Sequence, residues 1–167
     1  MAREGFDMDS GNDGREEGRR TGPEGVTVRE LSEADYPALI PLWNDELCNR
    51  NVNAENVAHH YARVKGDERY RTFVAVKGGE VVGFISSSLT YAVGFEGAFM
   101  QVIGVAVKSG EQGRGVGTLL FERMESCAEG LGCYSIGMNS GEKRVNAHAF
   151  YQKLGFYTDS LCFTKML

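Results

Sequence analysis

The sequence predicts an α/β (α+β) domain built on a mixed central sheet of six to seven strands that is flanked by about four helices. The first observation behind this prediction is an apolar run at 98–107, followed by a helical pattern from Val116 and a second strand at 134–138. A strand–helix–strand order of this kind is typical of two parallel strands joined by a crossover. The second observation is a pair of β-rich runs joined at Gly78-Gly79, which predicts an antiparallel hairpin. Parallel and antiparallel pairs together indicate a mixed sheet.

Length and composition favour one domain. The 167 residues, 42% of them hydrophobic, suffice for one buried core. No apolar run approaches the roughly 18 residues that a membrane-spanning helix needs, and the first residues lack the apolar core of a secretory signal. We therefore expect a cytoplasmic protein that has no membrane partner. The four cysteines form no C-x-x-C pair and stand at no zinc-ligand spacing with the three histidines, so no metal site is predicted.

The first 25 residues differ in composition from the rest. They contain six glycines and eleven charged residues but few apolar ones. Such a segment cannot offset the entropy cost of ordering by burying surface, so we predict a disordered tail over 1–25 and a folded domain over 26–167. The tail holds four Arg against seven Asp and Glu, which is −3 of the net charge of −5. The remaining −2 leaves the folded part without the basic excess that a nucleic-acid-binding surface requires.

A strand and two helices are predicted to come first in the folded part. The alternation of apolar and polar residues at 26–31 is typical of an edge or half-buried strand. A helix is predicted over 33–44, and Pro41 should kink or shorten it because proline lacks the N–H that the helix needs. A second helix is predicted over 54–64, where apolar residues share one face.

The same patterns predict the remaining elements. The strand at 98–107 carries apolar residues on both faces, which places it at the centre of the sheet. The helix from Val116 should end at Gly130 and Gly132. The others are strands at 71–76, 81–89, 134–138, 156–159 and 161–166, and a last helix at 144–154.

The turn between the central strand and its helix is rich in glycine. It reads Gln112-Gly113-Arg114-Gly115-Val116-Gly117-Thr118. Backbone N–H groups at such a turn can surround a phosphate, and the positive end of the helix dipole adds to the attraction. Two familiar phosphate-binding patterns do not fit. A P-loop requires Lys where this chain has Val116, and the dinucleotide fingerprint is G-x-G-x-x-G rather than the G-x-G-x-G found here.

The turn resembles instead the Q/R-x-x-G-x-G/A motif of the GNAT superfamily of acyl-CoA-dependent N-acetyltransferases. A strand ending in Val105-Ala106-Val107 precedes it, as in that family. Residues 147–156 read AHAFYQKLGF and resemble the A-x-x-F-Y-x-x-x-G-F segment of the family's last helix. The resemblance covers roughly Val26 to Leu167. It implies an acetyltransferase that binds acetyl-CoA, with antiparallel N-terminal strands and parallel strands four and five.

The resemblance implies a cofactor site along the fourth strand and the turn. In the family a bulge splays strand four from strand five, the freed backbone pairs with the pantetheine amides of coenzyme A, and the pyrophosphate lies at the helix N-terminus. The matching residues here are Val105, Ala106, Val107, Gln112, Gly113, Arg114, Gly115, Val116, Gly117 and Thr118. Asn146 is a further candidate, although the family's usual asparagine stands seven residues before the tyrosine, where this chain has Arg144.

The resemblance also indicates how an acetyl group would be transferred. Tyr151 matches the tyrosine that lies near the coenzyme sulfur and serves as general acid or hydrogen-bond donor. The backbone N–H of Val105 would polarise the thioester carbonyl. The general base is less clear-cut, because one branch of the family has a catalytic glutamate where this chain has Gln101. Either an ordered water chain or another carboxylate would act, and Glu96, just before the strand, is the candidate carboxylate.

Two functions from different classes fit these residues. The first is an N-acetyltransferase that moves an acetyl group from acetyl-CoA to a primary amine of a small molecule or peptide by direct attack on the thioester. The second is a non-catalytic acyl-CoA-binding module, which Gln101 favours and Tyr151 argues against. An RNA-bound substrate is disfavoured by the lack of a basic excess. Members of the family often form homodimers, but no pattern in this sequence indicates one.

Overall fold

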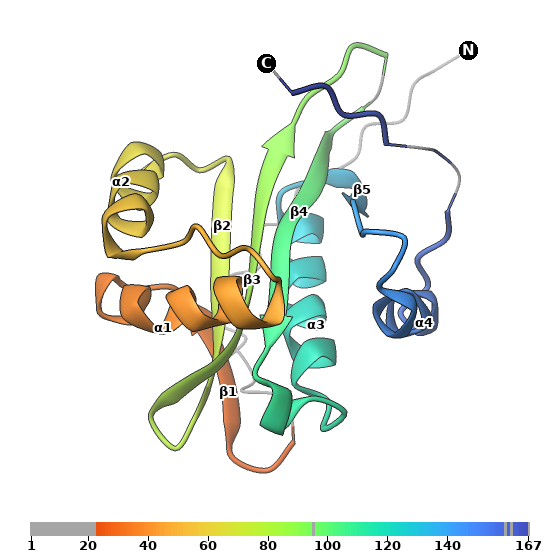
Figure 1. Cartoon of the computed structure of the whole chain (residues 1–167). Helices are drawn as coiled ribbons and strands as arrows, with labels where there is room; N and C mark the ends of the chain where they lie inside the picture. The colour runs from red at the N-terminus through yellow and green to blue at the C-terminus, as the bar shows by residue number, and fades with distance from the viewer. Residues whose placement is uncertain (1–22, 95, 159, 161, 167) are drawn as a thin grey trace, which may run out of the picture.

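One five-stranded sheet forms the centre of the protein (Figure 1). The computed structural model describes residues 23–94, 96–158, 160 and 162–166. The strands lie in the order β1-β2-β3-β4-β5. The pairs β1–β2, β2–β3 and β3–β4 are antiparallel, and the pair β4–β5 is parallel. The strands are β1 (Val26–Glu30), β2 (Tyr70–Lys77), β3 (Glu80–Thr90), β4 (Ala98–Val107) and β5 (Cys133–Met138).

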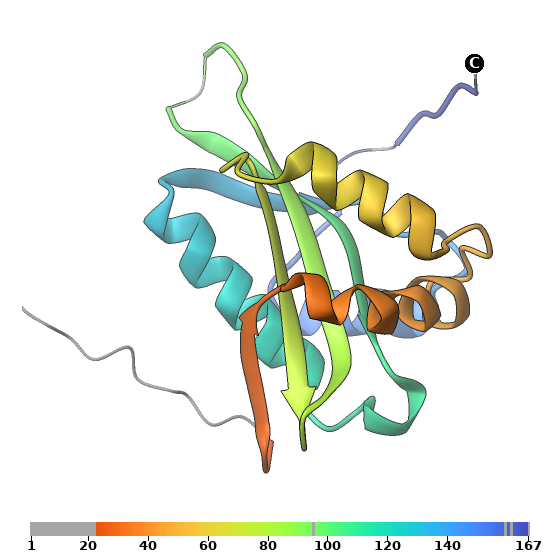
Figure 2. The same ribbon diagram turned by 90° about the vertical axis from the view of Figure 1, so that its left-hand side faces the viewer.

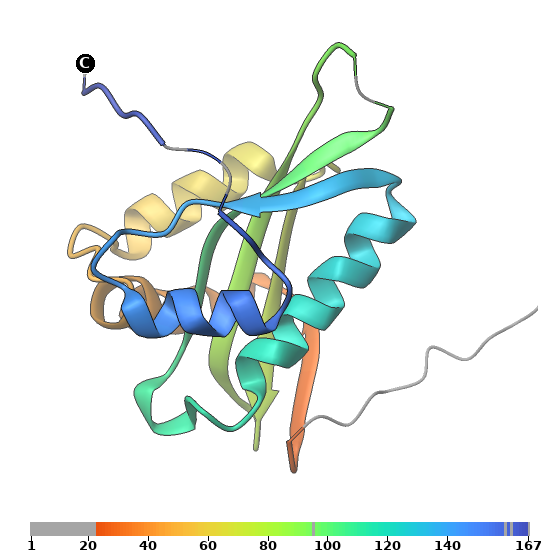
Figure 3. The same cartoon turned by 90° about the vertical axis from the view of Figure 1, so that its right-hand side faces the viewer.

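The prediction of six to seven strands is wrong for the described part of the chain, which has five. The two missing strands are those predicted at 156–159 and 161–166, where the described residues adopt no regular structure and residues 159 and 161 lie outside the description. A strand forms only beside a partner. The chain after α4 first runs toward the end of β5, and the described segment 162–166 then stands away from the sheet (Figures 2 and 3). The tail predicted at 1–25 lies, up to residue 22, outside the described residues.

Helices cover both faces of the sheet (Figure 2). Helix α3 (Val116–Gly130) lies on one face, with α4 (Val145–Lys153) beside it. Helices α1 (Tyr36–Pro41) and α2 (Ala54–Val64) lie on the other face. Short turns of 3-10 helix occur at η1 (Glu33–Asp35) and η3 (Ser109–Glu111).

Pro41 divides the helix that was predicted over 33–44. Helix α1 ends at Pro41, and the next turn, η2 (Leu42–Glu46), is a π-helix whose closing bond runs from the N–H of Leu47 to the carbonyl of Leu42 at 3.3 Å. Because proline donates no backbone hydrogen bond, the regular α-helical pattern cannot continue through it. Single π-turns are frequent at functional sites.

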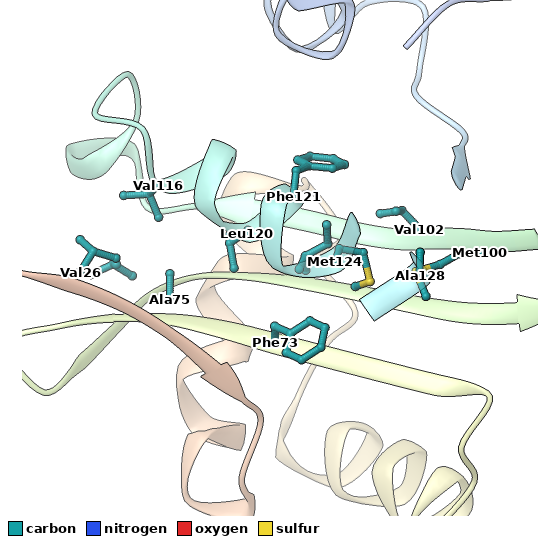
Figure 4. Packing of buried hydrophobic residues seen from close by; sticks show 12 residues of the cluster. Val26, Phe73, Ala75, Met100, Val102, Val116, Leu120, Phe121, Met124 and Ala128 are labelled. Atoms are coloured by element: carbon teal, nitrogen blue, oxygen red, sulfur yellow. The ribbon is translucent and has the colours of Figure 1, made fainter. Parts of the chain in front are cut away.

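The core consists of two apolar clusters, one on each face of the sheet. Leu120 and Met124 of α3 lie toward Phe73 of β2 on the first face, and Phe121 of the same cluster points to the other side of α3, where its ring meets that of Phe150 (Figure 4). Leu39 of α1 packs with Phe84 of β3 on the second face. Apart from that of Phe150, the side chains named here are fully screened from solvent. The prediction that 98–107 forms the centre of the sheet is wrong for the described residues, because β3 is the middle strand and β4 lies between β3 and the edge strand β5.

Candidate active site

Strand β4 contains a bulge at Ile103. Ser86 of β3 lies opposite Gly104, and the next residue, Ser87, lies opposite Val102. Ile103 therefore has no partner residue on β3 and is the extra residue of a β-bulge. The bulge reverses which side chains face α3. Those that pack on the α3 side are Met100 and Val102 before the bulge and Val105 and Val107 after it.

The parallel pairing of β4 with β5 ends at the same place. It runs from Ala98 to Val102, where β5 ends at Met138. Beyond Val102, within the described residues, β4 is paired with β3 only, and the side chain of Ile103 is 58% exposed. The backbone of 105–107 therefore lies on an open strand edge, where a ligand that carries amide groups can extend the sheet.

The glycine-rich turn 112–118 joins this open edge to α3. Gly113 and Gly115 have φ angles of 72° and 87°, a region that other residues rarely adopt. Gly115 is the N-cap of α3; no side chain bonds to the helix start there, and the first turn contains no acidic residue. The first N–H groups of α3 thus lack a side-chain cap and can bind an anion such as a pyrophosphate.

Charged and polar side chains hold the turn in place. The Gln112 amide donates to the carbonyl of Val107 at 2.9 Å and to the Glu46 carboxylate at 3.1 Å. Lys77 donates to the Glu111 carboxylate at 2.7 Å and lowers the pKa of Glu111 below its usual value. Arg114 lies 3.8 Å from the same carboxylate, but its side chain is 61% exposed. Arg114 can therefore exchange this weak contact for a phosphate.

Gly117 has a packing role in addition to its place in the motif. A Cβ atom on this residue would lie 3.0 Å from Cζ of Phe150 in α4. The absence of a side chain lets the aromatic ring of Phe150 lie against the first turn of α3. This contact brings the helix that carries Tyr151 close to the glycine-rich turn.

Tyr151 is half-buried in an aromatic cluster. Its ring centroid lies 5.9 Å from that of Phe121 and 5.6 Å from that of Phe150. Burial raises the pKa of Tyr151, and the positive charge of Arg144 acts in the opposite direction. Because burial raises its pKa further, the phenol keeps its proton at neutral pH and can donate a proton or a hydrogen bond.

Arg144 connects the two sides of the site. Its Nη2 atom donates to the carbonyl of Leu47 at 2.7 Å, a contact between residues 97 apart in sequence. The bond joins the N-cap of α4 to the end of the π-helical turn η2. Asn146 is the second residue of α4 and is exposed.

Trp43 is a site residue that the sequence analysis missed. Its indole ring lies on Gly104, one residue after the bulge, where a Cβ atom would come 2.9 Å from Cζ2 of the ring. The ring also packs on Phe84, with centroids 5.1 Å apart. Glycine inside a strand is a sign of close approach by another group, and Gly104 was the one signal that pointed to this contact.

The structure does not bring Glu96 together with Val105. Glu96 is exposed in the loop before β4, nine residues before Val105. Seven of these steps run along β4, from Ala98 to Val105, and at about 3.3 Å per residue they alone span about 20 Å. Gln101 is closer to the bulge, opposite Ser88 of β3 and Gly137 of β5.

Over the described residues, no group of three or more His, Cys, Asp or Glu side chains could hold a metal ion. None of the helices in the same part of the chain is long and apolar enough to cross a membrane.

A comparison with family models decides between the interpretations of this turn. The model of the acetyltransferase (GNAT) family matches residues 27–156. The chain belongs to the GNAT family. The activity of this family is acetyl transfer, and its members generally bind acetyl-CoA.

Solved structures share the GNAT fold. A transcriptional regulator from Bacillus halodurans C-125 is 24% identical, with a TM-score of 0.79 over 85% of this chain and 99% of that chain. An aminoglycoside acetyltransferase, meta-AAC0020 from an uncultured soil metagenomic sample, in complex with trehalose, is 18% identical, with a TM-score of 0.75 over 86% and 97%. AAC(6')-Iy, in complex with the bisubstrate analogue CoA-S-monomethyl-acetylneamine, is 16% identical, with a TM-score of 0.73 over 85% and 98%. At these identities the likeness concerns the fold.

The residues of this GNAT chain fit coenzyme A. The open edge at 105–107 offers backbone groups for the amides of pantetheine, and the turn at 112–118 offers N–H groups for the pyrophosphate. The hydroxyl of Ser140, between β5 and α4, is buried and has no hydrogen-bond partner among the described residues. A buried hydroxyl without a partner is costly, and a bound ligand or an ordered water that reached it would stabilise it.

Proposed function

We propose that this GNAT acetyltransferase transfers the acetyl group of acetyl-CoA to a primary amine of a small molecule or a peptide. The observation that carries the proposal is the open backbone edge of β4 at 105–107, which lies between the glycine-rich turn and the helix of Tyr151. One side of this edge offers a site for a phosphate and the other offers a protonated phenol. In acetyl-CoA bound along the edge, the pyrophosphate would lie at the first site and the thioester near the phenol.

In the proposed reaction, the neutral amine attacks the thioester carbonyl directly. The carbon–nitrogen bond forms and the carbon–sulfur bond breaks, while the N–H of Val105 donates a hydrogen bond to the carbonyl oxygen. Tyr151 gives its proton to the departing thiolate, a role for which burial keeps its phenol protonated. Because Glu96 is far from Val105 along the strand, we assign the removal of the amine proton to water.

The acceptor amine would approach from the face of the sheet that α1 and α2 cover. On this face Trp43 and Gln101 flank the bulge, and neither side chain is charged. Aminoglycosides are reasonable first substrates to try, because two solved structures with this fold are named aminoglycoside acetyltransferases or carry an acetylneamine analogue. Peptides with a free amine are the second class to try.

Calorimetry with acetyl-CoA tests the first part of the proposal. We expect binding at millimolar ligand, and no heat of binding under these conditions would contradict it. A panel of amines that includes sisomicin and short peptides then tests turnover. Binding without turnover of any amine, and without acetyl-CoA hydrolysis, would instead support a non-catalytic acyl-CoA-binding module.

The role of Tyr151 is tested by Tyr151→Phe. We expect turnover to fall by about 10²-fold or more with little change in acetyl-CoA affinity, because only the proton donor is removed. Tyr157→Phe is the matched control, since Tyr157 is 82% exposed outside the aromatic cluster. Full activity of Tyr151→Phe would remove this residue from the mechanism.

A further inference from the structure

The π-helical turn η2 belongs to the acceptor side of the proposed site but bonds to the cofactor side. It lies over β4 (Figure 1). The carboxylate of Glu46, its last residue, accepts a hydrogen bond from the backbone N–H of Ser109 at 2.8 Å and another from the amide of Gln112 at 3.1 Å. These two partners are 63 and 66 residues away in sequence and lie at the start of the glycine-rich turn. We call this pair of bonds the Glu46 clamp.

The clamp requires a carboxylate. The amide nitrogen of Gln112 carries two hydrogens, of which one goes to the carbonyl of Val107 at 2.9 Å and the other to Glu46. Both groups that bond to Glu46 are therefore donors, and a carboxylate, which only accepts, matches both. An amide in the same place would accept one bond and turn its own N–H groups toward the other donor. Because Val107 ends β4, the clamp joins η2, the end of the strand and the turn.

Glu46 lies on an element that is held on several sides. Leu42, the first residue of η2, is 1% exposed within the second core cluster, and the ring of Trp43 packs on β4. Leu47, which follows η2, accepts the hydrogen bond from Arg144 at 2.7 Å. A side chain on an element anchored in this way can keep its partners in one position.

We propose that Glu46 is a positioning residue for acetyl-CoA, because it holds the glycine-rich turn in the conformation that receives the pyrophosphate. The inference rests on the proposed function, which assigns the cofactor to this turn. Gly113 and Gly115 have positive φ angles, and glycine has more backbone freedom than any other residue. Without the clamp, only a fraction of the molecules has the competent turn, and the apparent affinity falls by that fraction. Glu46 thus acts by pre-organisation and not by contact with the cofactor.

Charge alone predicts the opposite effect of Glu46→Gln. The phosphates of acetyl-CoA are negatively charged, so removal of a carboxylate beside them should strengthen binding by lowering the repulsion. Loss of the clamp should instead weaken binding by about tenfold, the factor that follows if a tenth of the free molecules keep the competent turn. Asp45→Asn is the matched control, because it removes the same charge from the neighbouring, exposed residue of η2.

Calorimetry with acetyl-CoA on the wild type and the two variants makes the comparison. We expect about tenfold weaker binding by Glu46→Gln, and binding by Asp45→Asn that equals or exceeds that of the wild type. Unchanged or tighter binding by Glu46→Gln, or an equal loss in both variants, would overturn the inference and leave the proposed function in place. A wild-type chain that binds no acetyl-CoA would overturn both.

Hydrogen exchange on the free chain examines the clamp without the cofactor. Backbone amides at 109–118 should exchange faster in Glu46→Gln than in the wild type and in Asp45→Asn, whereas those of β2 and β3 should exchange at the same rate in all three. Equal exchange at 109–118 would contradict the clamp. Faster exchange throughout the domain would also overturn the inference, because it would indicate a general loss of stability.

A double-mutant cycle tests whether Glu46 acts through Gln112. Gln112→Met removes the amide but keeps the length of the side chain. Each single change should lower the affinity for acetyl-CoA by about tenfold, and the second change should add less than about twofold once the first is present. In turnover with any active amine, Glu46→Gln should raise KM for acetyl-CoA more than it lowers kcat. Losses of affinity that multiply in the double variant would show that the two side chains act independently and would overturn the inference.

Discussion

The indole ring of Trp43 lies against Gly104, so that the ring of the π-helical turn η2 packs on strand β4 at a position that has no side chain. A Cβ atom on Gly104 would come within 2.9 Å of Cζ2 of the ring. Both residues belong to the walls of the site. Gly104 comes one residue after Ile103, the bulge at which the edge of β4 opens. The contact connects the shape of the site to the packing of the second core cluster, in which Trp43 takes part.

Gly104→Ala is therefore expected to lower the free energy of unfolding by about 1–3 kcal/mol, the range found for overpacking of a well-filled core. Urea denaturation measures the loss. In a Trp43→Phe background the same change should cost less, because the smaller ring leaves room for the methyl group. Equal costs in the two backgrounds would show that Trp43 is not the group that Gly104 accommodates.

Gly115→Ala tests the backbone of the glycine-rich turn. The φ angle of 87° is unfavourable for alanine, so we expect a loss of about 1–2 kcal/mol in stability and weaker binding of coenzyme A. Gly110→Ala is the matched control, since Gly110 has no positive φ and a Cβ atom there would meet nothing within 4 Å. Denaturation and calorimetry measure the two effects. Equal behaviour of the two variants would contradict the role given to the left-handed conformation of Gly115.

Arg144→Gln should raise the pKa of Tyr151. Burial raises the pKa of Tyr151, and the positive charge of Arg144 lowers it. When the charge is removed, the effect of burial is no longer opposed. Ultraviolet titration of the phenolate, after subtraction of the Tyr151→Phe curve, should show a midpoint at higher pH than in the wild type. Arg144→Lys, which keeps the charge, should change the midpoint less. The loss of the bond to Leu47 should also cost about 1 kcal/mol in stability.

Asp35 contributes to the stability of the fold in acid. Its buried carboxylate accepts two hydrogen bonds from Arg29, at 2.6 and 2.8 Å, and others from Ser32, and these hold the pKa of Asp35 far below its usual value. The lowered pKa means that this stabilisation is fully present above the unfolded-state value of about 3.9 and is lost as the pH falls further.

Asp35→Asn should therefore lower the free energy of unfolding by about 2 kcal/mol at pH 7, a value typical of hydrogen bonds to a charged group. We choose a modest value because the side chain of Arg29 is half-exposed, and solvent weakens its attraction to Asp35. The variant should also lose stability less steeply than the wild type below pH 4. Urea denaturation at a series of pH values measures both. Glu30→Gln, which removes an exposed carboxylate one residue from Arg29, is the control that should keep the steep acid dependence. An unchanged slope in Asp35→Asn would contradict this assignment.

Elements that depend on local pattern could be predicted closely. The bounds of β4 and α2 agree with the predicted 98–107 and 54–64, and α3 begins at Val116 as predicted. These segments have a clear period of 2 or 3.6, and glycine or a capping residue marks their ends. The strands predicted at 156–159 and 161–166 have a similar pattern, but a strand also needs a neighbouring edge, which a pattern cannot supply. The assignments of Val105, Tyr151 and the cofactor-binding residues remain predictions.

The sequence by itself indicated the family through the resemblance of its two motifs, at 112–117 and 147–156, and the family model confirmed it. It also determined the glycine-rich turn and the order of elements around it, because backbone conformation and periodicity are local properties. The family resemblance implied a bulge in strand four, and only the tertiary structure decided that it lies at Ile103. The tertiary structure alone also decided that Trp43 covers Gly104 and that Arg144 binds the carbonyl of Leu47, 97 residues away. The tertiary structure also placed Glu96 in the loop before β4, away from Val105, and made β5 an edge strand of the described sheet. Each of these depends on which distant segments pack together, and that is set by the shape and burial of the whole domain.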